Sequence, residues 1–196
     1  TLGMLTIVRS LVLIVSGDRS MSSFPKAFQW IGQGKIFSIP NPIWIFIILV
    51  IIAEIVLRRM KIGRLPFFVG SNAQAAELSG LRVKKIQFIL YALCGCAAGI
   101  AGVVSVARLN AAFPLAGNGA ELRIIAAAVI GGCSLSGGQG SIVGALLGVI
   151  LMAIINNLLI LTGVPVYWQG LVAGLVLIVA VGFDEYSKRR RGEVRT

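Results

Sequence analysis

The stretch that decides the fold runs from Arg58 to Lys85 and reads R-R-M-K-I-G-R-L-P-F-F-V-G-S-N-A-Q-A-A-E-L-S-G-L-R-V-K-K. It is the one long polar interval in a chain whose mean hydropathy is +0.93, and it lies between two long apolar runs. It contains seven of the eighteen lysines and arginines but a single acid, Glu77. Because basic residues near a membrane span stay on the cytoplasmic side, we expect this interval to face the cytoplasm.

The apolar runs on both sides of this interval set the fold class. The chain is 57% hydrophobic and 13% charged, and its apolar runs approach the roughly 20 residues that a helix needs to cross a bilayer. These features predict an all-α fold, a polytopic membrane helix bundle that forms one domain over residues 1–196. The six expected membrane segments are Thr1 to Ser16, Ile43 to Leu57, Ile86 to Ala107, Leu122 to Cys133, Ile142 to Leu161 and Val166 to Phe183.

A second basic segment, the tail from Asp184 to Thr196, bears on the number of crossings. If this tail and the Arg58 to Lys85 interval both face the cytoplasm, an even number of spans separates them, so Leu122 to Cys133 must cross. Twelve helical residues reach only about 18 Å. Such a short span is tolerated where protein shields it or where it lines a cavity, so this segment is a candidate wall of a transport pathway.

The remaining segments are expected outside the membrane, the largest being Gly17 to Pro42. Within it, Pro25 to Ile31 is either a helix lying on the membrane interface or a plain loop. Trp44 and Trp168 fall near the outer ends of spans, where an aromatic belt places such residues. The first apolar segment is short and has no initiator methionine, so we expect the chain to be a fragment of a longer protein.

Several functional classes are excluded by composition. The chain has no histidine, which removes the commonest general base and the usual transition-metal ligand. Cys94, Cys96 and Cys133 fall in apolar runs without partner ligands, so we predict no metal site and no catalytic residue. The net charge of +11 comes mainly from span ends without interleaved aromatics, so no nucleic-acid partner is expected.

Leu135 to Gln139 reads L-S-G-G-Q, the signature with which ATPase subunits of ABC transporters contact nucleotide. The chain lacks a G-x-x-x-x-G-K-[ST] loop, and the pentapeptide falls in a tight turn between two expected membrane helices. We therefore assign no ATP binding to it. A serine nucleophile at Ser134 or Ser136 is rejected as well, because no histidine is available as a base.

Small residues recur at helical spacing, at Gly140, Gly144 and Gly148 and again at Gly95 and Gly99, which favours close helix packing. In a transporter the same spacing would instead let one helix slide over another.

Asn156 and Asn157 lie in the outer half of the expected fifth span, where an amide needs a partner. They make either interhelical hydrogen bonds or contacts to a solute. Arg9 and Glu54, also in apolar runs, either pair or lie near a span end.

Three long motifs point to a family. They are G-R-L-P-F-F-V-G-S-N-A-Q-A-A-E-L-S-G-L-R-V-K-K-I (Gly63 to Ile86), A-G-N-G-A-E-L-R-I-I-A-A-A-V-I-G-G-C-S-L-S-G-G-Q-G-S (Ala116 to Ser141) and N-N-L-L-I-L-T-G-V (Asn156 to Val164). In this order they resemble the permease subunits of ribose-type sugar ABC importers, over essentially the whole chain. The match is to the C-terminal part of that family, whose full-length members have about ten membrane helices. One residue departs from the family pattern: Arg123 follows the E-L pair of the second motif, where the family usually has an acidic or a small residue.

The resemblance implies a homodimeric, multi-pass channel in the bacterial inner membrane with a cytoplasmic C-terminus. Its expected partners are an ABC ATPase subunit, a periplasmic sugar-binding protein, a second copy of the permease and the lipid bilayer. No cofactor is expected on this chain, and ATP and Mg would bind to the partner ATPase.

The resemblance also implies roles for individual residues. Residues 58–85 become a cytoplasmic coupling loop whose helix docks on the ATPase. Ser71 or Asn72 can cap this helix and Gly80 can end it. The implied coupling-helix residues are Gly70, Ser71, Asn72, Ala75, Ala76, Ser79 and Gly80, with Ala75 and Ala76 suggested for the contact face. The implied pathway residues are Glu121, Asn156 and Asn157.

Other functions remain open. An ABC permease for another small solute, such as a branched-chain amino acid or a nucleoside, is the nearest alternative. A secondary transporter would need ionisable residues near the membrane midplane, and the third to sixth segments have none in their interiors. A purely structural membrane subunit would not need a cytoplasmic docking helix. The sequence does not name the sugar.

Overall fold

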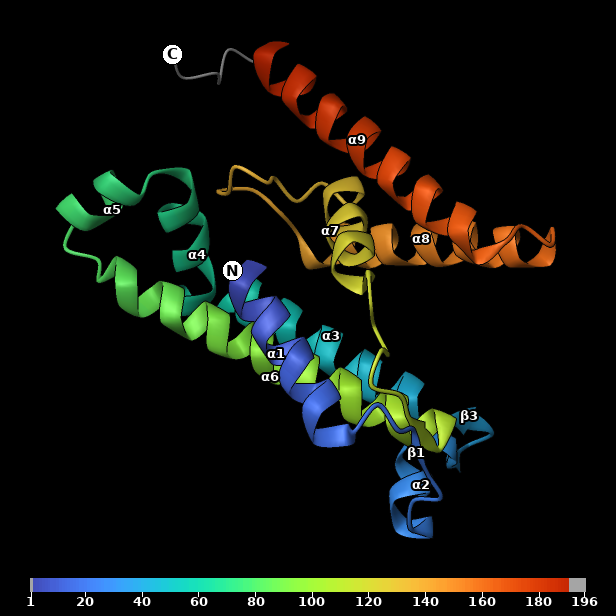
Figure 1. The fold of residues 1–196 in the computed structure, drawn as a ribbon. Helices are drawn as coiled ribbons and strands as arrows, with labels where there is room; N and C mark the ends of the chain where they lie inside the picture. The colour runs from blue at the N-terminus through green and yellow to red at the C-terminus, as the bar shows by residue number, and fades with distance from the viewer. Residues whose placement is uncertain (1, 191–196) are drawn as a thin grey trace. The chain divides into compact units, whose positions relative to one another are not determined.

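A computed structural model describes residues 2–190 of the chain, and these residues are mostly helical (Figure 1). The expected all-α membrane fold is confirmed, and each of the six apolar segments contains a helix. These six helices are α1 (Leu2–Ser16), α3 (Asn41–Arg59), α6 (Val83–Leu109), α7 (Ala120–Ile130), α8 (Ile142–Leu161) and α9 (Val166–Arg190). The tail predicted to be cytoplasmic lies outside the described residues from 191 onward.

Three of these helices are long and apolar enough to cross a membrane: α3, α6 and α8, with mean hydropathies of 2.1, 2.1 and 2.4 over their most apolar stretches. Shorter apolar helices cover Gly3–Ser16 and Trp168–Gly182. The predicted shortness of the fourth segment is confirmed, since α7 has only 11 residues. Side chains such as Ile48, Ile52 and Phe88 are exposed, as expected for helices surrounded by lipid or by other membrane helices. The protein is a multi-pass membrane protein.

The chain forms two compact units, and the first comprises residues 1–51 and 91–116. Here α2 (Lys26–Gln33) shows that the Pro25 to Ile31 stretch is a helix rather than a loop. Gly32 of α2 packs so closely on the backbone of Ala107 and Arg108 that no side chain would fit. Strands β1 (Met21–Ser22) and β4 (Ala111–Ala112) pair antiparallel, as do β2 (Lys35–Ile36) and β3 (Ile39–Pro40). The sequence patterns predicted neither ladder.

The second unit comprises residues 52–90 and 117–196, and α7 is its centre. Helices α8 and α9 both pack against α7, around a small core of Ala126, Ala127 and Met152. Close approach depends on glycine: a β-carbon on Gly148 would overlap the carbonyl of Ala127, and one on Gly144 would overlap that of Gly131. The predicted close packing is therefore confirmed at Gly144 and Gly148.

The other glycines singled out in the sequence behave differently. Gly140 lies in the turn before α8, where a β-carbon would sit 3.1 Å from the sulfur of Cys133. A β-carbon added to Gly95 or Gly99 would meet no neighbouring atom of the described residues within 4 Å, so their predicted close packing is not seen within this chain.

Two further helices lie between α3 and α6 in the polar interval (Figure 1): α4 (Lys61–Ser71) and α5 (Ala73–Leu78). The sequence predicted only one short helix here. Helix α4 forms although it contains Pro66, and its first turn folds back on the end of α3. A β-carbon on Gly63 would overlap the backbone of Val56, so this reversal requires a residue without a side chain.

Candidate functional site

Helix α5 lies within the expected coupling helix and has well-formed ends. The side chain of Asn72 accepts a hydrogen bond of 3.0 Å from the amide of Ala75, so Asn72 is the N-cap rather than Ser71. At the other end, Leu81 N donates to Ala76 O and Gly80 N donates to Glu77 O, with Gly80 at a φ of +82°. This is a Schellman motif, and it confirms that Gly80 ends the helix.

The boundaries of the predicted coupling helix need one correction. Gly70 and Ser71 are not part of it, because they form the last residues of α4, and Asn72 separates α4 from α5 in an extended conformation. The physical reason is the preference of an N-cap asparagine for non-helical dihedral angles, which breaks what reads as one helical run. Ser79 is the C-cap, and its hydroxyl donates to Ala75 O at 2.8 Å.

The two alanines suggested for a contact face differ in exposure. Ala75 is exposed, whereas Ala76 is only 6% exposed and packs inside the unit. At 100° per residue, the face opposite Ala76 carries Gln74 and Leu78, with Ala75 beside them. Leu78 is 90% exposed, which is unusual for a leucine on a helix in a polar interval. Sequence reasoning missed Leu78, although a lone leucine among polar and small residues was a usable signal.

The end of α4 contacts the L-S-G-G-Q turn, two segments far apart in the sequence. A β-carbon on Gly70 would lie 2.6 Å from Gly138 N, and one on Gly137 would lie 2.7 Å from Gly70 O. A β-carbon on Gly138 would lie 2.9 Å from the Cβ of Ser71. Distances below 3.0 Å are not tolerated by real side chains, so the two backbones touch directly. Gly70 and Ser71 therefore belong to the junction between α4 and this turn.

The turn itself is a closed loop between α7 and α8. Ser134 N donates to Gln139 O at 3.0 Å, and Gly137 N donates to Ser134 O at 3.2 Å. Gly137 and Gly138 have φ values of +88° and +79°, which favour glycine. The L-S-G-G-Q sequence thus has a structural explanation here: two left-handed residues and a backbone contact with α4.

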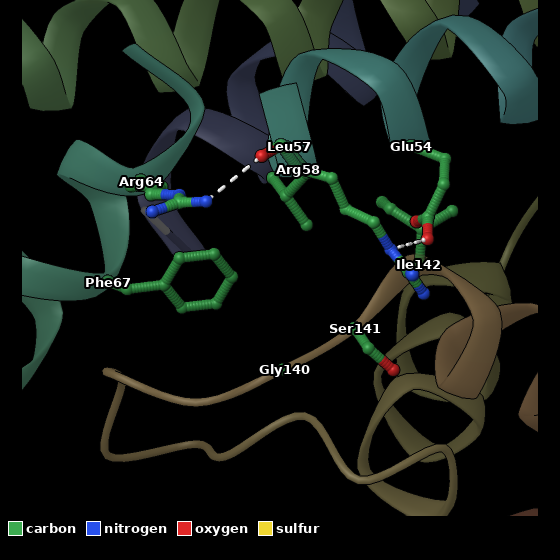
Figure 2. A pocket seen from close by; sticks show the side chains of 8 residues that line it. All are labelled: Glu54, Leu57, Arg58, Arg64, Phe67, Gly140, Ser141 and Ile142. Carbon is green, nitrogen blue, oxygen red and sulfur yellow. Dashed lines mark hydrogen bonds and ion pairs between the residues drawn. The ribbon is translucent and has the colours of Figure 1, made fainter. Parts of the chain in front are cut away.

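A cavity of about 490 Å³ lies beside this junction, between the end of α3, helix α4 and the start of α8 (Figure 2). Arg58 forms an ion pair through Nε with Glu54, one turn earlier on α3. Glu54 thus lies near a span end, one of the arrangements that the sequence left open, and its ion pair with Arg58 was not predicted. Arg64 of α4 donates from Nη2 to the carbonyl oxygen of Arg58 at 3.2 Å, which caps the end of α3. Leu57, Phe67, Gly140, Ser141 and Ile142 complete the lining.

The expected pathway residues lie on two helices that pack together. Glu121 is half-buried in the first turn of α7, where a carboxylate interacts favourably with the helix dipole. Asn156 is half-buried and continues the α8 stripe of Gly148 and Met152 that faces α7, while Asn157 is exposed, about 100° around the helix. Within the described side chains, neither amide group has a hydrogen-bond partner. The two asparagines therefore have different surroundings.

Comparisons with known proteins agree with this architecture. The chain is 40% identical over 188 residues to the ribose import permease protein RbsC of Escherichia coli (strain K12), which covers 94% of this chain and 59% of that relative. It is 38% identical over 192 residues to the L-arabinose ABC transporter permease protein AraH of Azospirillum brasilense, covering 97% of this chain and 56% of the relative. It is 37% identical over 186 residues to RbsC of Bacillus subtilis (strain 168), covering 94% and 58%. No solved structure matches the chain.

The chain spans less than three fifths of the length of these curated relatives, at most 59%. A family model described as "Branched-chain amino acid transport system / permease component" matches residues 1–181. This range includes helices α1 to α8 and most of α9. Because this match covers far more than half of the chain, the protein belongs to the family of branched-chain amino acid type transport permeases.

Proposed function

We propose that the chain is part of the transmembrane permease subunit of an ABC importer, which receives a sugar from a periplasmic binding protein and releases it into the cytoplasm. The observation that carries this proposal is the 38–40% identity to ribose and arabinose permeases over 94–97% of the chain. In this proposal the chain is a transport subunit without catalytic activity. ATP and Mg bind to a separate ATPase partner.

The charge distribution supports one orientation. The basic α4–α5 interval and the basic tail face the cytoplasm, and the α2 region faces the periplasm, in a bacterial inner membrane. Arg58 and Arg59 in the last turn of α3 fit this orientation, because they lie where that helix would leave the hydrocarbon layer. At the opposite end of α3, Trp44 lies in the first turn, and its indole N–H donates a hydrogen bond of 3.3 Å to Ile36 O.

Helix α5 is the proposed contact with the ATPase. It is short, capped at both ends and exposed on the face of Gln74, Ala75 and Leu78. An exposed leucine beside small residues suits a groove on another protein, since the apolar side chain is the energetic anchor and the alanine allows close approach. The coupling loop thus has a defined docking face, with Ala76 on the inner side.

The contact between α4 and the glycine turn supplies a route from the docking face to the membrane. A displacement of α5 moves α4, and α4 touches the turn through the backbone of Gly70, Gly137 and Gly138 and through the Cβ atom of Ser71. The turn joins α7 to α8, the two helices that carry Glu121, Asn156 and Asn157. Because no long side chain lies in the contact, a small movement of α4 displaces the turn directly.

The pathway assignment follows the exposure of the asparagines. Asn157 faces away from α7, so its amide needs a partner from outside the unit, either a solute or a second copy of the permease. Asn156 faces the packed side of α8. We therefore place solute contact at Asn157 and packing at Asn156, in a permease that works as a homodimer.

The test is transport by the full-length permease in proteoliposomes with its ATPase and its binding protein. We expect accumulation of a labelled pentose that requires both ATP and the binding protein. Uptake that follows an ion gradient without ATP would overturn the proposal in favour of a secondary transporter. The family description also makes branched-chain amino acids a second candidate. Uptake of leucine in place of ribose or arabinose would support that alternative.

A further inference from the structure

The cavity between α3, α4 and α8 has the properties of an anion site at a membrane surface. We propose that it binds the phosphate headgroup of an anionic phospholipid. This inference goes beyond the proposed transport function and does not depend on it. Figure 2 shows the residues that carry the argument.

The position of the cavity sets the kind of ligand. It lies where α3 ends at Arg59 and where α8 begins at Ile142, and both helices are long and apolar enough to span a membrane. A cavity at the ends of two spans lies at the level of the lipid headgroups. Its lining combines the apolar side chains of Leu57, Phe67 and Ile142 with charged and polar groups, as an amphiphile requires.

Positive charge enters the cavity from two helices. The Nε atom of Arg58 forms an ion pair with Glu54, and the guanidinium group of Arg58 extends toward Ser141 and Ile142 (Figure 2). Arg64 lies on the other side of the cavity, where its Nη2 atom donates a hydrogen bond to the carbonyl oxygen of Arg58. The remaining Nη atoms of both arginines have no partner among the described residues. The lining of the cavity contains two guanidinium groups and one carboxylate, so its net charge is positive and favours an anion. The planar, forked guanidinium group also fits a phosphate.

The start of α8 adds backbone donors at the same place. The first intrahelical hydrogen bond runs from Ala145 N to Ser141 O. Gly144 N donates a hydrogen bond of 3.0 Å to the hydroxyl oxygen of Ser141. The amides of Ile142 and Val143 precede this first bond and stay open for a ligand, within the described part of the chain. In a helix of 20 residues these amides lie at the positive end of the dipole. Arg58 and the first residue of α8, Ile142, both line the cavity, so the guanidinium and the start of this helix border the same space.

The volume agrees with a headgroup rather than with a bare ion. About 490 Å³ is several times the space that a single phosphate needs, and it lies within the range of small-molecule sites in proteins. The apolar walls at Leu57 and Phe67 are suited to the glycerol and the first carbons of the acyl chains. Basic pockets between spanning helices are known generally to recognise anionic lipid headgroups.

The test counts lipids bound to the full-length protein in detergent by native mass spectrometry, with phosphatidylglycerol and phosphatidylcholine titrated separately. We expect the first phosphatidylglycerol to bind more tightly than phosphatidylcholine. Arg64→Gln and the double variant Glu54→Gln/Arg58→Gln should each weaken that first binding by about tenfold, the loss expected for one charge-assisted hydrogen bond. The double variant avoids leaving Glu54 without its partner.

Two matched controls distinguish specific lipid binding in the cavity from general attraction of anionic lipid to a basic surface. Arg59→Gln removes a neighbouring positive charge that does not line the cavity, and it should change binding less than twofold, roughly the effect of a distant screened charge. Glu54→Gln keeps Arg58 and an acceptor for its Nε, and it should bind phosphatidylglycerol at least as well as the unmodified protein. Unchanged thermal unfolding of each variant shows that folding is not the cause.

Three results would overturn the proposal. An effect of Arg59→Gln equal to that of Arg64→Gln would indicate general attraction to a basic surface. Loss of binding in Glu54→Gln would show that the carboxylate is the recognising group. Displacement of phosphatidylglycerol by inorganic phosphate at a similar concentration would identify a site for free anions rather than for lipid.

Discussion

Gly70 and Gly138 are in direct backbone contact: a β-carbon on Gly70 would lie 2.6 Å from the amide nitrogen of Gly138. This contact joins the end of α4 to the turn between α7 and α8. It also explains why two glycines follow each other in the turn, since Gly137 meets Gly70 and Gly138 meets Ser71. The junction is therefore the point at which α4 can act on α7 and α8, the two helices that the turn joins.

The first prediction concerns this junction. Gly70→Ala and Gly137→Ala each place a methyl group into backbone atoms, an overlap that costs about 1 to 3 kcal/mol. We expect both variants to bind the ATPase normally but to lose uptake, because the turn is pushed away from α4. A coupling loss of this size corresponds to roughly five- to 150-fold in uptake. Co-purification with the ATPase and uptake in vesicles measure the two properties separately.

Gly132→Ala is the matched control for Gly137→Ala. Gly132 has a similar φ, +84° against +88°, and lies in the same connection, but a β-carbon there would meet nothing within 4 Å among the described residues. Both variants therefore carry the strain of a left-handed alanine, and only Gly137→Ala adds the contact. Equal uptake in the two variants would show that strain, and not coupling, limits transport.

The sequence predicted the membrane helices well because a single physical effect dominates them. Long apolar runs must form helices in lipid, where every backbone group needs an internal hydrogen bond. The ends of α5 were also predictable, since Asn72 and Gly80 act through local backbone geometry. The shortness of α7 followed from the few apolar residues between Glu121 and Cys133.

Other features depend on contacts between distant residues, which no local pattern records. Helix α4 contains Gly63 and Pro66, two residues that read as loop signals, and it forms because Gly63 allows the chain to fold back on Val56 and because Val69 is buried. The two-residue ladders are too short for any alternating pattern. The contact of Gly70 with Gly138 and the burial of Ala76 are likewise tertiary, so the sequence treated Ala75 and Ala76 as equivalent.

The second prediction concerns the exposed face of α5. Ala75→Glu should leave insertion and thermal stability unchanged, because Ala75 is exposed, but it should abolish co-purification with the ATPase by placing a charge at an apolar contact. Ala76→Glu should instead lower stability itself, because a carboxylate would replace a buried methyl group. Thermal unfolding and ATPase pull-down of both variants distinguish the two effects.

Leu78 extends this test to a residue with a large apolar side chain. Leu78→Ala should weaken ATPase binding by about 1 to 3 kcal/mol, as for an anchor residue at an interface, with no change in unfolding. Glu77→Gln, on the flank of the same helix, is the control and should bind normally. Full ATPase binding by Leu78→Ala and Ala75→Glu together would show that α5 is not the docking helix.

The third prediction concerns the cap of α5. Asn72→Ala removes the acceptor for Ala75 N, and loss of such a cap costs about 1 kcal/mol of helix stability. In a helix of six residues this should fray the first turn and lower ATPase affinity several-fold. Asn72→Asp retains an oxygen at the same position and should restore binding. Equal weakening by both substitutions would indicate that the amide itself touches the partner.

The last prediction separates the two asparagines of α8. Asn157→Leu should reduce sugar uptake in the full-length permease while thermal stability, dimer assembly and ATPase activity without binding protein stay unchanged, because Asn157 is exposed and faces away from α7. Asn156→Leu should act mainly on packing, because Asn156 continues the stripe of Gly148 and Met152. Asn157→Gln, which keeps an amide, should retain part of the uptake. Dissociation of the dimer by Asn157→Leu would instead place this side chain in the contact between two permease copies and remove it from the pathway.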